Sequence, residues 1–169
     1  LDLTGTIPDS KTARAFIKDA DAQKRTELID QLLASENYAT HMATVFDVML
    51  MERRPDKYVT TSEWRTFLAD SFRANKPLNA LVAEILGADG VDEKLRPAAK
   101  FYLDRAVAKD VLVRDIGRLF LGVDLQCAQC HDHPEIDDYL HQHYHGLSVF
   151  VAGSKTFKQP DGQFVLQEV

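Results

Sequence analysis

The sequence is organised around residues 119–134, which read Leu119-Phe120-Leu121-Gly122-Val123-Asp124-Leu125-Gln126-Cys127-Ala128-Gln129-Cys130-His131-Asp132-His133-Pro134. Both cysteines of the chain lie in this stretch. Covalent haem attachment requires two thiols about one helical turn apart, each adding to a different vinyl group of one porphyrin, and a histidine beside the second thiol to reach the iron. The stretch therefore predicts one covalently bound haem c, with Cys127 and Cys130 as the attachment residues and His131 as the proximal iron ligand.

We expect this haem loop to lie between two helices. Asp110 can cap a helix that ends at Gly122, and Asp137 can cap a last helix that runs to Val151. A strand-like pattern occurs only in the region 157–169, where the final run has no evident partner. The predicted fold class is all-α: an irregular multi-helix domain with the haem loop between its last two long helices and a short extended C-terminal tail.

Earlier in the chain, apolar residues recur with the spacing of one helical face. The expected helices cover residues 10–19, 22–35, 38–50, 62–72 and 78–86. Ser62 is the expected cap of the fourth, Pro77 suits the first turn of the fifth, and Gly87 ends it. Residues 87–97 are expected to form a loop. Trp64 and Tyr102 could pack on the porphyrin, although aromatic residues in helices more often fill the core.

Composition limits the classes of function. A chain of 169 residues with 45% apolar content can bury one core, so residues 1–169 are expected to form a single domain. The abrupt start suggests an excerpt of a longer multidomain protein. A net charge of −6 argues against nucleic acid as a partner, because neutralising phosphates needs a basic surface. No segment is apolar for long enough to span a membrane.

The two cysteines are also compatible with other chemistry. A tetrahedral zinc site could use Cys127, Cys130 and His133, with a fourth ligand from His141 or His145. The second cysteine pair of a usual zinc ribbon is missing. A thioredoxin-like dithiol belongs at a strand-to-helix junction of an α/β domain, and the sequence lacks those strands.

An electron carrier needs a second strong ligand on the other face of the haem iron. The candidates are His143, Met51, His41 and His133. His143 lies near the apolar face of the last helix, whereas the short connection from His131 makes it hard for His133 to cross the ring. The cluster Glu52-Arg53-Arg54 could meet haem propionates, because guanidinium groups match carboxylates; a solvated helix end is the alternative.

The wider sequence resembles the planctomycete cytochrome C-like domain of the second type, a family first catalogued as a domain of unknown function. Its pattern Cys-Ala-Gln-Cys-His-Asp-His-Pro matches residues 127–134 one by one. The match extends to the segments 2–5, 32–35, 49–55, 96–102, 137–139 and 144–147. The resemblance implies a secreted or periplasmic domain in large multidomain bacterial proteins, beside a second cytochrome-like domain. It implies no settled reaction.

The leading hypothesis is a c-type cytochrome domain that transfers electrons outside the cytoplasm to a redox partner protein or an adjacent cytochrome domain. Such a domain needs no substrate pocket, and the sequence contains no separate nucleophile, phosphate loop or paired carboxylates. One alternative is a haem enzyme or gas-binding sensor with an open distal site. Another is a structural or interaction module stabilised by zinc or by a Cys127–Cys130 disulfide. Whether the domain is an enzyme stays open, with non-catalytic electron transfer favoured.

Overall fold

The computed structural model describes residues 1–168. Its helices are α1 (Ser10–Lys18), α2 (Lys24–Leu33), α3 (Glu36–Met51), α4 (Thr61–Arg73), α5 (Leu78–Gly87), α6 (Lys100–Leu103), α7 (Lys109–Ile116) and α8 (His141–Ala152). The connections contain the 3-10 turns η1 (Arg96–Ala99) and η3 (Cys127–Gln129), the π-helical turn η2 (Gly117–Leu121), and the strands β1 (Ser154–Lys158) and β2 (Phe164–Glu168). The described chain is therefore mostly helical, as expected, with one small sheet.

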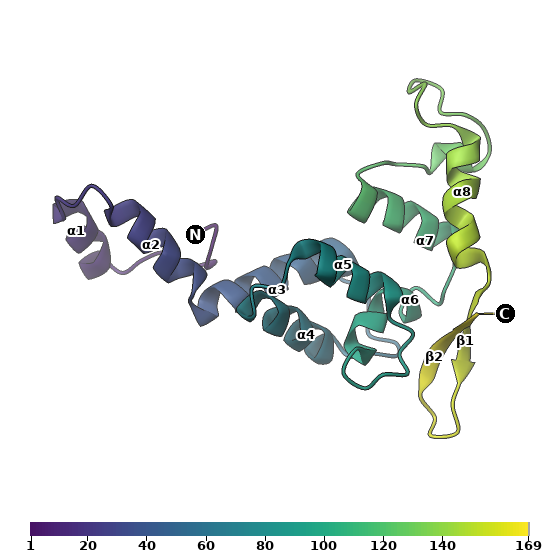
Figure 1. The fold of residues 1–169 in the computed structure, drawn as a ribbon, viewed down its shortest axis with the longest axis horizontal. Coiled ribbons are helices and arrows are strands. Elements are labelled where there is room, and N and C mark those ends of the chain that lie inside the picture. The colour runs from purple at the N-terminus through teal and green to yellow at the C-terminus, as the bar shows by residue number, and fades with distance from the viewer. Residues whose placement is uncertain (169) are drawn as a thin grey trace.

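The molecule is elongated, and its core lies toward the C-terminal half. Figure 1 shows α1 and α2 at one end of the long axis, α3 and α4 side by side in the middle, and α7, α8 and the β-hairpin at the other end. Neither α1 nor α2 contains a buried residue. The fully buried side chains come from α3 onward and include Trp64, Leu68 and Phe101. No helix among the described residues combines the length and apolar character that crossing a bilayer requires.

The start of α4 corrects one predicted cap. Thr60, not Ser62, precedes the helix: the Thr60 hydroxyl accepts a hydrogen bond from the Glu63 amide at 3.2 Å, and the Glu63 carboxylate accepts one from the Thr60 amide at 2.9 Å. This reciprocal capping box satisfies two amides that the helix leaves unpaired. Trp64 follows directly and is fully buried beside Phe67. It packs in the protein core, in line with the commoner role of helix aromatics.

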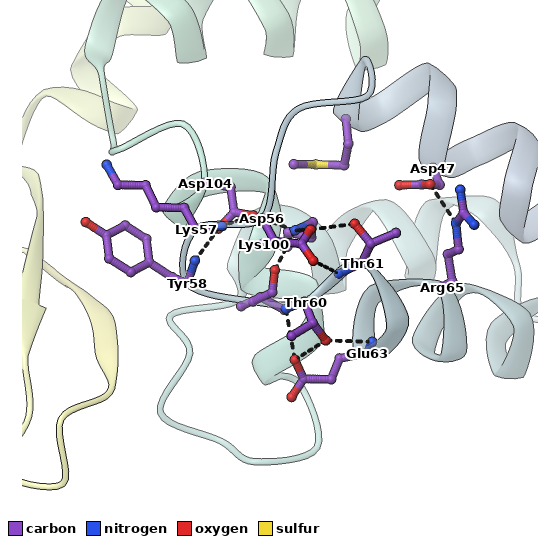
Figure 2. Close-up of polar contacts among 12 residues, drawn as sticks. Asp47, Asp56, Lys57, Tyr58, Thr60, Thr61, Glu63, Arg65, Lys100 and Asp104 are labelled. Carbon is purple, nitrogen blue, oxygen red and sulfur yellow. Dashed lines mark hydrogen bonds and ion pairs between the residues drawn. The ribbon is translucent and has the colours of Figure 1, made fainter.

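The sequence pattern did not indicate η1 and α6, yet they form the most buried part of the chain. Lys100 is fully buried, and its Nζ donates to Asp56 at 2.9 Å, to Asp104 at 2.5 Å and to the Val59 carbonyl at 2.5 Å. Figure 2 shows these contacts joining α6 to the segment between α3 and α4. A buried lysine requires such partners because an unpaired ammonium in the interior is costly. The charged residue interrupts the apolar pattern that would have indicated a core helix.

The C-terminal tail is a hairpin, which corrects the expectation of an unpaired extended run. β1 and β2 pair antiparallel with Thr156 opposite Leu166. The Leu166 amide also donates to the Asp89 carbonyl at 2.7 Å, so the hairpin is tied to the loop after α5. Val165 is buried, and Val169, the last residue of the predicted tail, lies outside the described residues.

Candidate haem-attachment site

The turn that carries the two cysteines follows a helix that ends where the sequence predicts. After α7 and η2, Gly122 adopts a left-handed conformation with φ of 68°, which favours glycine, and the Val123 amide donates back to the Gly117 carbonyl at 3.0 Å. Leu125 and Ala128 are buried. These two buried residues fix η3 to the protein core.

Cys127 and Cys130 lie at opposite ends of η3, joined by a long hydrogen bond of 3.5 Å from the Cys130 amide to the Cys127 carbonyl. Both side chains are exposed, and both are free thiols. With Ala128 buried between them, the turn presents its two cysteines to the outside. The chemistry available is that of two accessible thiols close together on a fixed turn.

His131 has the tautomer that a metal ligand needs. Its Nδ1 lies 2.6 Å from the Asp132 carbonyl oxygen. A carbonyl oxygen only accepts, so Nδ1 carries the proton and Nε2 keeps its lone pair. Histidines that bind metals usually donate their other ring N–H in this way, which fixes the ring and its tautomer. The contact that orients His131 is made by the main chain of Asp132.

His133 is held differently. Its Nδ1 accepts hydrogen bonds from the amides of Glu135 and Ile136 at 3.2 and 3.0 Å, and its ring packs edge-on against Tyr139. A neutral ring that accepts at Nδ1 carries its proton on Nε2. In this conformation His133 shapes the loop after the cysteine turn and has no free lone pair for a metal.

His143 has a similar role at the start of α8. Its Nδ1 accepts a hydrogen bond from the Leu140 amide at 3.3 Å, in the manner of a capping box. Its Nε2 therefore carries the proton as well. The residue best placed by the sequence to be the second axial ligand is engaged in holding its own helix end.

The remaining distal candidates lie on α3. Met51 is buried, and its sulfur accepts a hydrogen bond from Nη1 of Arg105 at 3.5 Å. His41 lies near the opposite end of that helix, against Gly5: a β-carbon on Gly5 would lie 2.5 Å from Nδ1 of His41. The structure therefore places Met51 in the core and His41 against the N-terminal turn that contains Gly5.

An apolar groove of about 520 Å³ lies beside the cysteine turn. Its walls come from both sides of the turn, with Leu121, Val123 and Leu125 before it and Tyr139, Leu147 and Phe150 after it. Leu121 and Phe150 are 59% and 81% exposed. Val123 and Leu125 thus supply apolar surface near the cysteines, although Cys127, Cys130 and His131 are not among the residues that line the groove.

The arginine cluster is mostly engaged inside the protein. The buried carboxylate of Asp115 receives Arg105 and Arg114 at 2.7 Å and Arg54 at 3.3 Å. Burial alone would raise the pKa of Asp115, but hydrogen bonds from Arg105 and Arg114 outweigh it and hold that pKa below its ordinary value. Glu52 pairs with Arg54 and Arg118.

Of the predicted Glu52-Arg53-Arg54 cluster, two members are thus used in ion pairs. Arg53 is exposed, and no ion pair holds it within residues 1–168. Arg53 is therefore the member left to meet an external carboxylate.

The zinc alternative is not assembled. Among residues 1–168, no three histidine, cysteine, aspartate or glutamate side chains converge as metal ligands. His133 uses Nδ1 for the loop, whereas His141 and His145 face each other, with their Nε2 atoms 2.8 Å apart.

The sequence pattern missed two contacts that fix the site. The Tyr144 hydroxyl donates to Asp110 at 2.7 Å and joins α8 to α7. Asp132 accepts the main-chain N–H of His141 at 2.7 Å, whereas Asp137, the expected cap of this helix, makes no hydrogen bond within the described chain. The apolar spacing of α8 is the sequence signal that could have indicated Tyr144 as an inward-facing residue.

Comparison with known proteins gives one result. The model of the family PSCyt2, described as a protein of unknown function (DUF1549), matches residues 1–156. No curated protein and no solved structure matches the chain. The matched region includes the cysteine turn and ends within β1. The chain therefore belongs to the PSCyt2 family.

Proposed function

We propose that this domain is a c-type cytochrome that binds one haem covalently through Cys127 and Cys130, uses His131 as the proximal ligand, and transfers electrons outside the cytoplasm. The proposal rests on the exposure of the two thiols and on the tautomer of His131. Two exposed free thiols lie on one short turn, and the adjacent His131 is held by the Asp132 carbonyl with Nε2 unprotonated. The donor set fits the group: each thiol can add across one vinyl group, and a neutral imidazole can bind iron.

When bound, the haem supplies reversible one-electron chemistry at its iron. The chain's own residues provide the surroundings. Leu125 and Ala128 hold the turn from the interior, and the groove lined by Val123 and Leu147 offers apolar surface of the kind a porphyrin ring requires. Exposed Arg53 offers a guanidinium for a propionate.

A second candidate is a haem domain with an open distal position, which suits a small external ligand. Its support is the hydrogen bonding of the candidate sixth ligands. His133 and His143 both accept main-chain hydrogen bonds at Nδ1, and the Met51 sulfur is buried against Arg105. In this arrangement none of the three presents a free donor atom. A shift of the visible spectrum on addition of carbon monoxide or cyanide would distinguish this candidate from an electron carrier with both axial positions filled.

The proposed location is the periplasm or the cell exterior, because covalent haem attachment requires a maturation system found outside the cytoplasm. The proposed partner is a redox protein or an adjacent cytochrome domain of the same polypeptide. A net charge of −6 favours a partner with a basic surface over a nucleic acid.

The test is a visible spectrum with pyridine haemochrome analysis on protein matured in a periplasm. We expect a c-type band, lost in the Cys127→Ala/Cys130→Ala double variant and kept in Gln126→Ala, which changes an exposed neighbour on the same turn. His131→Ala should keep the attached haem and alter its spectrum. If no band forms and zinc or a Cys127–Cys130 disulfide is found instead, the proposal is wrong and the domain is a structural or interaction module.

A further inference from the structure

Two histidines on α8 form a close pair apart from the cysteine turn. His141 and His145 lie one helical turn apart, their ring centroids are 4.3 Å apart, and their ring planes are nearly perpendicular. Their Nε2 atoms approach to 2.8 Å. Two nitrogen lone pairs cannot face each other at this distance, so one Nε2 carries a proton that it donates to the other. A metal ion can take the place of that proton.

We propose that His141 and His145 bind a divalent transition-metal ion that prefers imidazole, namely Ni²⁺, Cu²⁺ or Zn²⁺. Two nitrogens bound tetrahedrally to one zinc ion lie roughly 3.3 Å apart. The observed pair is closer by about half an ångström, a change that small side-chain rotations provide. His145 is exposed and His141 half-buried, so water completes the coordination. The site does not depend on haem.

The helix that carries the pair is fixed in place. Between the two histidines, Tyr144 is 2% exposed and donates to Asp110 on α7. Ser148 and Val151 continue the buried face of α8. Asp132 accepts the His141 N–H and holds the first turn. A rigid backbone preserves the spacing of the two rings, so little conformational entropy is lost when a metal binds.

The segment that carries the pair is acidic. Residues 119–154 contain no lysine or arginine and include five of the six histidines. The same segment carries five exposed carboxylates, at Asp124, Asp132, Glu135, Asp137 and Asp138. Asp132 lies against the main chain of His141 itself. Excess negative charge in this segment raises the concentration of cations near it, which assists the two imidazole ligands but does not form the site by itself.

The experiment is a calorimetric titration of Ni²⁺ into the chain with both thiols blocked, by haem thioethers where haem is attached and by alkylation where the thiols are free. Blocking removes the competing ligands Cys127 and Cys130. We expect one Ni²⁺ per chain. His141→Ala and His145→Ala should each weaken binding at least about tenfold, since even the outer partners of metal-bound histidines are worth 10–100-fold in affinity.

His143→Ala is the matched control, because it removes a third histidine of the same helix whose Nδ1 faces the Leu140 amide. It should leave Ni²⁺ affinity unchanged, and circular dichroism should show all variants folded. Cu²⁺ electron paramagnetic resonance should show nitrogen ligands that are lost with either member of the pair. Equal affinity in His145→Ala and the unmodified chain, or an equal loss in His143→Ala, would overturn the proposal whether or not the chain carries haem.

Discussion

The carboxylate of Asp132 accepts the main-chain N–H of His141 at 2.7 Å. This bond joins the residue directly after Cys127-Ala128-Gln129-Cys130-His131 to the first residue of α8. Because the Asp132 carbonyl also accepts the Nδ1–H of His131, one residue fixes both the proposed iron ligand and the helix that follows. We therefore expect the loop and the start of α8 to keep a fixed position relative to each other.

Replacing Asp132 with alanine should destabilise the domain by about 0.5–2 kcal/mol, the cost of losing a helix cap. Urea unfolding followed by circular dichroism measures this change. Asp137→Ala is the matched control, because Asp137 is the cap that the sequence suggested and its carboxylate is exposed. It should change stability by less than about 0.5 kcal/mol. Equal effects of the two substitutions would contradict the assigned cap.

Replacing Asp115 with alanine should cost about 3–5 kcal/mol, because the buried guanidinium of Arg105 then loses its carboxylate. Glu52→Ala removes a partly exposed acid from the same arginine cluster and should cost less than about 1 kcal/mol. Urea unfolding of the three proteins under the same conditions tests this difference. A small effect of Asp115→Ala would show that Arg105 finds another partner or reaches solvent.

Tyr144 should titrate above the ordinary range of tyrosine. Burial, followed by the hydrogen bond to Asp110, raises its pKa to about 12. Because the pKa is raised in the folded state, the stabilising contribution is present below about pH 10 and is lost as pH rises toward 12. Burial also raises the pKa of Tyr102, so ultraviolet titration should show late-titrating tyrosines whose amplitude falls by one residue in Tyr144→Phe. If that variant retains the full amplitude of the late transition, Tyr144 is not one of the residues responsible.

Much of the helical framework follows from local pattern, and the exceptions have physical causes. The expected helices between residues 10 and 87 all occur, because their apolar spacing matches a helical period. The segment 96–103 was missed because Lys100, a charged residue, occupies a fully buried position whose partners Asp56 and Val59 are distant in sequence. The partner of β2 was missed because strand pairing depends on a turn and a register that one alternating run does not specify.

The candidate site shows the same limit at finer scale. The spacing of Cys127, Cys130 and His131 could be recognised from sequence, because the chemistry depends on neighbouring positions. The hydrogen bonds of the His133 and His143 rings could not be recognised from sequence, since they depend on which main-chain amides lie near each ring. The Asp110–Tyr144 bond joins residues 34 positions apart and leaves no local pattern.

Covalent haem at the cysteine turn can be tested by the mass of the protein matured in a periplasm, followed by mapping of the tryptic peptide that contains residues 127–131. We expect a mass gain of one haem, located on that peptide through Cys127 and Cys130 and absent when both are alanine. An unmodified peptide from protein matured alongside a haem-loaded control cytochrome would contradict it.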